Sequence, residues 1–198
     1  MQPKLIIHGG AGSSLQGKGG VEAVRKLLYG ILEEVYGLLK EGASASDAVV
    51  RGCQLLEDEP RFNAGTGSVL QSDGQIRMSA SLMDGHRQRF SGVINVARVK
   101  NPIDLALRLQ AEDDRVLSDQ GSAELLRELQ LPIYNPLTDL RLNEWMEERK
   151  GNFHRTSGGG DCGAGSCPRS GSGGRPGHHR RGGIGSRRPS GGGHLHRG

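Results

Sequence analysis

Two short glycine-containing segments carry the residue types from which a catalytic centre or an ion site could be built. The first is His8-Gly9-Gly10, and the second is the loop-like sequence Asn63-Ala-Gly-Thr-Gly-Ser68. Because glycine has no side chain, the backbone of such loops can approach a ligand closely, and its amides and carbonyls can point inward around an ion or a reacting group. Taken alone, each segment is better interpreted as a plain connector, so any chemistry has to be argued from the surrounding sequence.

The sequence around these segments predicts a layered α+β domain. A short apolar run at residues 4–8, ended by the glycines, predicts a buried strand. Residues 21–40 place apolar side chains at helical spacing with charged ones on the opposite side. A second helix is expected to begin close to Ser44, with Ser44 or Ser46 as its cap. We expect this helix pair to form a layer that covers a sheet.

A pair of strands is predicted after the second glycine segment. Residues 76–83 and 90–99 have strand-like apolar patterns, and the Asp84-Gly85 sequence between them is typical of a tight turn. Two consecutive strands joined by a short turn pair antiparallel, so we expect a β-hairpin here.

Helices are predicted to follow the hairpin. Asn101 is expected to cap the first of them, because Pro102 suits the first turn and Asp104 would face the positive end of the helix. Two more helix candidates follow, at residues 122–129 and 139–150.

The segment 156–198 differs sharply in composition from everything before it. It holds 16 Gly, 7 Arg and 4 His, and it has no aromatic residue. The chain has a formal net charge of +4, of which this segment supplies +6, so the first 155 residues sum to −2. With so few apolar residues the segment cannot build a core and is predicted to be a disordered tail. The basic charge therefore lies outside the predicted domain of residues 1–155.

The three cysteines, Cys53, Cys162 and Cys167, do not make a disulfide framework, and Cys53 fits a small buried hydrophobe. The sequence has no apolar run long enough to span a membrane and no pattern of a secretory signal at its start. We therefore expect a cytoplasmic protein without a membrane partner.

Several of these segments together resemble one family. His8-Gly-Gly-Ala-Gly12 resembles the opening of the plant-type L-asparaginases, also called isoaspartyl peptidases, and the sequence from Leu55 to Ser68, which ends in FNAGTGS, resembles a characteristic loop of that family. Met83-Asp-Gly85, the strand at residues 90–99 and Asn101-Pro102 also fall where the family has them. The resemblance covers residues 4–150, and the combination is far more specific than any one motif.

The resemblance implies a fold and a mechanism. Members of the family are N-terminal-nucleophile hydrolases with an αββα sandwich, of which this chain would supply only the first-subunit half. Their precursors cleave themselves before a threonine, which becomes the first residue of a second subunit and attacks the amide of asparagine or of a β-aspartyl peptide. Its own α-amino group acts as the base.

The resemblance also implies roles for particular residues. His8, Gly9 and Gly10 match a glycine loop that supports the active site, and Asn63 matches an asparagine close to the nucleophile. No cofactor is implied, apart from a structural sodium ion held by backbone carbonyls. Those carbonyls would belong to Leu56, Glu57, Glu59, Phe62, Ala64 and Thr66. Family members assemble as (αβ)2 dimers.

The chain departs from the family where the second subunit should begin. The family has a segment close to GTVGAVALD there, and the printed sequence contains no such string. Neither Thr66, Thr138 nor Thr156 stands in that context. The chain as printed is therefore expected to lack the catalytic threonine and to be inactive.

The genetic code suggests an origin for the segment 156–198. If its codons were read one base later, residues 177–197 could give GTIGAVALDRDGHLAAATSTG, with a threonine at the position of His178. The hypothesis is that a one-base shift between Arg155 and Gly177 replaced the second subunit with out-of-frame sequence. Codons that cannot give threonine in the shifted frame would refute it.

Two other interpretations of this segment stay open. Its Arg-Gly-Gly stretches are similar to disordered RNA-binding segments, which would make the chain a non-enzymatic protein that binds nucleic acid. Cys162, Cys167 and the four histidines could instead hold zinc, although their spacing matches no common pattern.

Overall fold

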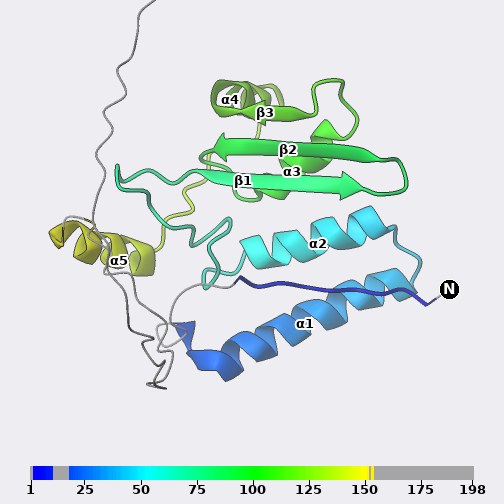
Figure 1. The fold of residues 1–198 in the computed structure, drawn as a ribbon, viewed down its shortest axis with the longest axis horizontal. Coiled ribbons are helices and arrows are strands. Elements are labelled where there is room, and N and C mark those ends of the chain that lie inside the picture. Colours follow the sequence, from blue (N-terminus) through cyan, green and yellow to red (C-terminus); the bar gives the residue numbers. More distant parts are fainter. Residues whose placement is uncertain (1, 11–17, 152, 154–198) are drawn as a thin grey trace, which may run out of the picture. The chain divides into compact units, whose positions relative to one another are not determined.

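The computed structural model describes residues 2–10, 18–151 and 153, and the predictions made for residues 156–198 fall outside them. The described part is built from helices and a small mixed sheet (Figure 1). In chain order the elements are α1 (Gly20–Lys40), α2 (Ala45–Glu57), β1 (Met78–Asp84), β2 (Arg89–Val96), α3 (Pro102–Leu109), β3 (Val116–Ser118), α4 (Asp119–Glu128) and α5 (Asp139–Lys150).

Helices α1 and α2 confirm the prediction from helical spacing and pack against each other. Val24, Ile31 and Val35 are the buried residues of α1, and they recur on one side at helical spacing. The turn after α1 contains Gly42 at φ 96°, a left-handed conformation that suits glycine. Helix α2 then begins at the predicted cap, where the Ser44 hydroxyl accepts a 3.1 Å hydrogen bond from the Asp47 amide.

The sheet has three strands in the order β1-β2-β3. Strands β1 and β2 pair antiparallel, as predicted for a hairpin, with Met83 opposite Phe90. Strand β3 pairs parallel with β2. It has only three residues, too few for an alternating pattern to be recognised, and the sequence did not predict it.

One face of this sheet is covered by α3, which lies behind β1 and β2 in Figure 1. Val93 of β2 and Leu105 of α3 are both fully buried there. Val50 of α2 packs against Ile103 of α3 and Leu82 of β1, so α2 also reaches this layer. The expectation that the pair of α1 and α2 covers a sheet is therefore incomplete, since α3 makes the main helix contacts with β1 and β2.

The opposite face of the sheet exposes apolar side chains of all three strands. They include Met83, Phe90, Ile94 and Val116, each of them about half exposed. Ser81 and Gly92 lie between them on the same face. Exposed apolar area of this kind is rare on monomeric proteins and promotes association.

The prediction of a buried strand at residues 4–8 is wrong. Leu5 and Ile7 pack against the core between α1 and α2, but Ile6 is 95% exposed, and no strand is assigned to this segment. An apolar run predicts contact with a core, whereas a strand also needs a hydrogen-bonded neighbour. Within the described residues these amides and carbonyls have no such neighbour.

The prediction that Asn101 caps α3 is half wrong. Asn101 occupies the cap position, but its side chain makes no capping bond and donates instead to the Asp58 carboxylate, at 3.1 Å. The first turn of α3 is capped from another helix, because Glu57 at the end of α2 accepts a 3.1 Å bond from the Ile103 amide. In the described part of the chain, no helix combines the length and apolar character needed to cross a membrane.

Candidate functional site

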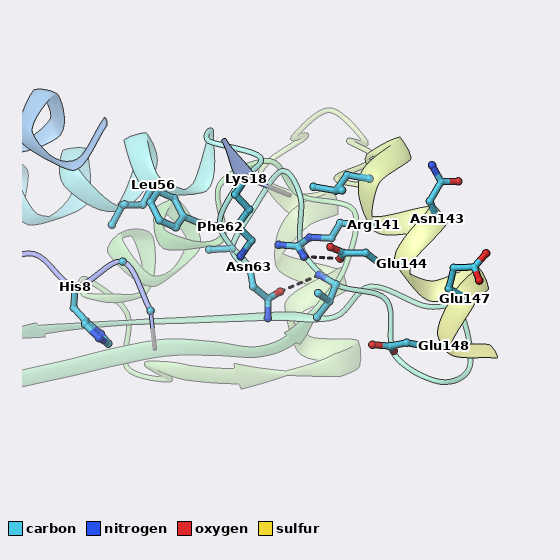
Figure 2. A pocket seen from close by; sticks show the side chains of 15 residues that line it. His8, Lys18, Leu56, Phe62, Asn63, Arg141, Asn143, Glu144, Glu147 and Glu148 are labelled. Carbon is cyan, nitrogen blue, oxygen red and sulfur yellow. Dashed lines mark hydrogen bonds and ion pairs between the residues drawn. The ribbon is translucent and has the colours of Figure 1, made fainter. Parts of the chain in front are cut away.

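Three separate segments form most of the wall of a hollow of about 1060 Å³ (Figure 2), which Lys18 and Leu56 also line. The first is the glycine segment at residues 8–10, and the second is the loop that follows α2, which contributes residues 62–64 and Val69. The third is one side of α5, from Leu140 to Glu148. The two segments singled out in the sequence therefore meet at one pocket.

The glycine segment lies directly against the loop after α2. A Cβ atom at Gly9 would stand 3.0 Å from the ring of Phe62 and 3.3 Å from the side chain of Leu28. Phe62 is itself buried. A larger residue at Gly9 would push the segment away from the loop, so this glycine permits the close approach that the sequence predicted.

The loop after α2 is folded tightly upon itself. A Cβ at Gly65 would stand 2.4 Å from the backbone oxygen of Glu57, and one at Gly67 would stand 2.3 Å from that of Pro60. Both glycines have positive φ, at 56° and 86°. The Thr66 amide donates to the Glu57 carbonyl at 2.7 Å, which closes the loop back onto the end of α2. Only glycine fits either position without moving backbone atoms.

Asn63 lies on the pocket side of this loop. Its Oδ1 accepts a 2.9 Å hydrogen bond from the Val69 amide, drawn as a dashed line in Figure 2. The side chain is exposed, and its Nδ2 group has no hydrogen-bond partner among the described residues. Asn63 therefore offers two N–H donors to a ligand, in an orientation set by the bond to Val69.

Glu57, at the foot of the loop, is a buried carboxyl. Its side chain is 6% exposed, one oxygen accepts from Ile103, and the other has no hydrogen-bond partner among the described residues. Burial raises the pKa of Glu57 to about 7, and the nearby charges of Asp104 and Asp58 act in the same direction. The nearby Asn101 side chain and the bond from the Ile103 amide oppose this shift in the pKa, but they are the weaker influences.

This shift gives the protein a predicted pH dependence of stability. The unfolded chain releases the Glu57 proton around pH 4.5, while the folded chain keeps it until about pH 7. Stability is therefore full below pH 4.5 and falls as the pH rises through 7, by at most about 3 kcal/mol. We expect Glu57→Gln to remove most of this fall, since glutamine stays neutral and can still accept from Ile103. Urea unfolding of the parent and of Glu57→Gln at pH 5 and pH 8 measures this fall in the free energy of unfolding. An equal fall in both proteins would contradict the assignment of the pH dependence to Glu57.

Comparisons with known proteins identify the family. Residues 1–186 match a family model described as Asparaginase. The chain belongs to the asparaginase family. It is 74% identical over 159 residues to an isoaspartyl peptidase/L-asparaginase of Nostoc sp., a match that covers 80% of this chain and 50% of the relative. A protein of the same name from Synechocystis sp. is 69% identical over 149 residues, covering 75% and 45%.

More distant asparaginase-family relatives match over the same share of their length. A plant-type L-asparaginase of Pyrococcus horikoshii is 39% identical over 146 residues, covering 72% of this chain and 47% of the relative. The chain thus spans about half the length of the curated relatives that it matches. These comparisons give no support to the expectation that the chain is inactive, or to the nucleic-acid alternative.

Family membership confirms the resemblance that was argued from the glycine segments, and the structure brings these segments together. His8, Gly9, Gly10 and Asn63 all line the pocket. Sequence reasoning missed the third wall, α5, and in particular Arg141, the buried residue of this helix. An arginine in a charged helix is usually solvated, so its type gave no warning. The absence of an apolar stripe in α5 was the one available signal that polar groups hold this helix in place.

The loop after α2 offers backbone carbonyl oxygens, which are ligands of the kind that sodium binds. Neutral carbonyl oxygens suit a hard cation, and the last carbonyls of α2 form the negative end of a helix. The carbonyls of Glu57 and Glu59 already accept amide hydrogens within the loop, from Thr66 and Phe62, which leaves each oxygen one lone pair. The carbonyl ligands and the tight path of the loop therefore fit the interpretation that this loop binds sodium.

Proposed function

We propose that this chain is the first-subunit part of an amidohydrolase that acts on L-asparagine and on β-aspartyl peptides. One observation carries the proposal most directly. The glycine segment and the loop of Asn63 line one pocket, with the free Nδ2 donors of Asn63 on its wall. The names of the Nostoc and Synechocystis relatives supply the substrate class.

In this proposal each segment of the chain has a defined task. The Nδ2 group of Asn63 donates to an oxygen of the substrate or of the reacting centre, and its preset orientation avoids reorganisation during the reaction. Gly9 keeps the glycine segment close enough to Phe62 to form the adjoining wall. The nucleophilic threonine belongs to the second subunit, as the resemblance implies, and needs no base from this chain.

The finer features carried by the resemblance are part of the same proposal. Residues 1–155 form the first-subunit region, the complete protein is an αββα sandwich assembled as an (αβ)2 dimer, and its location is the cytoplasm. A sodium ion held by backbone carbonyls fixes the loop and takes no part in proton transfer. The carbonyls are those of Leu56, Glu57, Glu59, Phe62, Ala64 and Thr66.

A chimaera tests the proposal. Residues 1–155 of this chain are joined to the second half of the Nostoc relative, and the purified protein is assayed for ammonia from asparagine and aspartate from a β-aspartyl dipeptide. We expect activity within about tenfold of the intact relative, since the matched parts are 74% identical and protein cores tolerate substitutions that conserve volume. The full-length chain 1–198 and the intact relative are assayed beside it.

The outcomes separate the hypotheses. A folded chimaera that is inactive on both substrates, beside an active relative, would refute the proposed function. Activity of the full-length chain alone would refute the expectation that it lacks a nucleophile. The rival, nucleic-acid binding, predicts salt-dependent binding by the full-length chain that is lost when residues 156–198 are deleted.

A further inference from the structure

We propose that Arg141 is a positioning residue for Asn63, acting through the backbone of Gly67. The inference deepens the proposed function and rests on it for its catalytic meaning. Its geometric content concerns four residues of the described chain and can be measured without any activity assay.

Arg141 is the anchor of α5. Its exposed fraction is 5%, and it is the buried residue of α5, a helix that otherwise faces solvent. Burial of a guanidinium is costly unless its donors are satisfied. Arg141 satisfies two of them, since Nε donates to the Gly67 carbonyl at 2.6 Å and NH1 donates to the Glu144 carboxylate at 2.7 Å. The Glu144 bond, visible in Figure 2, orients the guanidinium toward the loop.

Gly67 is held on both sides by the same segment. Its carbonyl accepts from Arg141, and its amide donates to the Pro136 carbonyl at 2.8 Å. Residues 136–141 therefore fix both hydrogen-bonding groups of one peptide position. Gly67 has no side chain to restrict its backbone and lies at φ 86°, so these two hydrogen bonds supply the restriction on its backbone conformation.

The constraint reaches Asn63 through Val69. The Val69 amide, two residues beyond Gly67, donates the bond that orients the Asn63 side chain. Two residues span at most about 7 Å, so the position of this amide follows that of Gly67 closely. If Arg141 releases the Gly67 carbonyl, the Val69 amide loses its fixed position, and the Asn63 donors lose their direction.

Hydrogen exchange in the full-length chain tests the geometry. We expect Arg141→Met, which keeps a long side chain but has no hydrogen-bond donor, to speed the exchange of the Val69 amide about tenfold, because its bond to Asn63 opens more often. Trp145→Phe is the matched control, since it removes another bond from α5, Trp145 Nε1 to the Gln71 carbonyl at 2.8 Å, without touching Gly67. This control should leave Val69 exchange unchanged. Arg141→Lys, which keeps a donor, should show a smaller effect than Arg141→Met.

Equal acceleration in Arg141→Met and Trp145→Phe, or none in either, would overturn the proposal. Acceleration that extends to amides inside α1 in Arg141→Met would mean general unfolding and would also count against it.

A double-mutant cycle in the chimaera tests the catalytic meaning. Arg141→Met should lower kcat about tenfold when Asn63 is present and have no further effect in the Asn63→Ala background, with KM little changed in both. A merely structural role predicts the same loss in both backgrounds and would refute positioning. If the chimaera is inactive while Val69 exchange responds as expected, the proposed function fails and the geometric link stands.

Discussion

Gly67→Ala is expected to destabilise the chain by about 4 kcal/mol, the largest effect of any single substitution considered for this loop. Alanine in the left-handed conformation costs about 1–2 kcal/mol on its own. The added Cβ would also lie 2.3 Å from the Pro60 oxygen and 2.8 Å from two further backbone atoms of Pro60. Backbone atoms cannot rotate away as a flexible side chain can, so the loop itself has to shift.

Gly42→Ala is the matched control for this prediction. Gly42 also has a left-handed backbone, at φ 96°, but a Cβ there would meet nothing within 4 Å. The control should therefore cost only the conformational part, about 1–2 kcal/mol. Urea unfolding of both variants measures the difference. If the two losses are equal, the close packing of the loop against Pro60 is wrong.

Asn63→Asp is expected to lower kcat of the chimaera by about two to three orders of magnitude, as loss of a preorganised donor does at other active sites. Aspartate keeps an oxygen that can accept from Val69, so the loop retains its 2.9 Å bond. It replaces the two N–H donors of Asn63 by a second acceptor. The change thus separates the support of the loop from donation to a substrate.

Comparison with Asn63→Ala completes this test. Alanine removes both the donors and the bond to Val69, so it should lose at least as much activity and should also speed Val69 exchange. Asn63→Asp should leave that exchange close to the parent value. An Asn63→Asp chimaera with parental kcat would show that Asn63 serves the loop alone and donates nothing to the substrate.

The local part of the fold could be predicted from the sequence, because its signals lie within a few residues. Helical spacing predicted α1, and the turn at Asp84-Gly85 predicted the β1–β2 hairpin. The failures involve partners that are distant along the chain. The segment at residues 4–8 has the apolar pattern of a strand without a hydrogen-bonded neighbour in the described residues, and α3 is capped by Glu57, 46 residues before Ile103.

The same limit applies to the candidate site: its local features could be predicted from the sequence, and its distant partners could not. The glycine segments indicated close backbone approach, and Gly9, Gly65 and Gly67 each show it. Their meeting at one pocket could be expected only through the family resemblance. The contribution of Arg141 could not be predicted, since its partner Gly67 lies 74 residues earlier and a glycine carbonyl leaves no mark in the sequence.

This separation between Arg141 and Gly67 has a consequence during protein synthesis. The ribosome makes the loop first and the residue that secures it 74 positions later. At about 5–20 residues per second, the growing chain carries the unsecured loop for roughly 4–15 s. The pocket is therefore completed late, after the hairpin and the first helices have had time to form. The Asn63 donors acquire their direction only when α5 emerges.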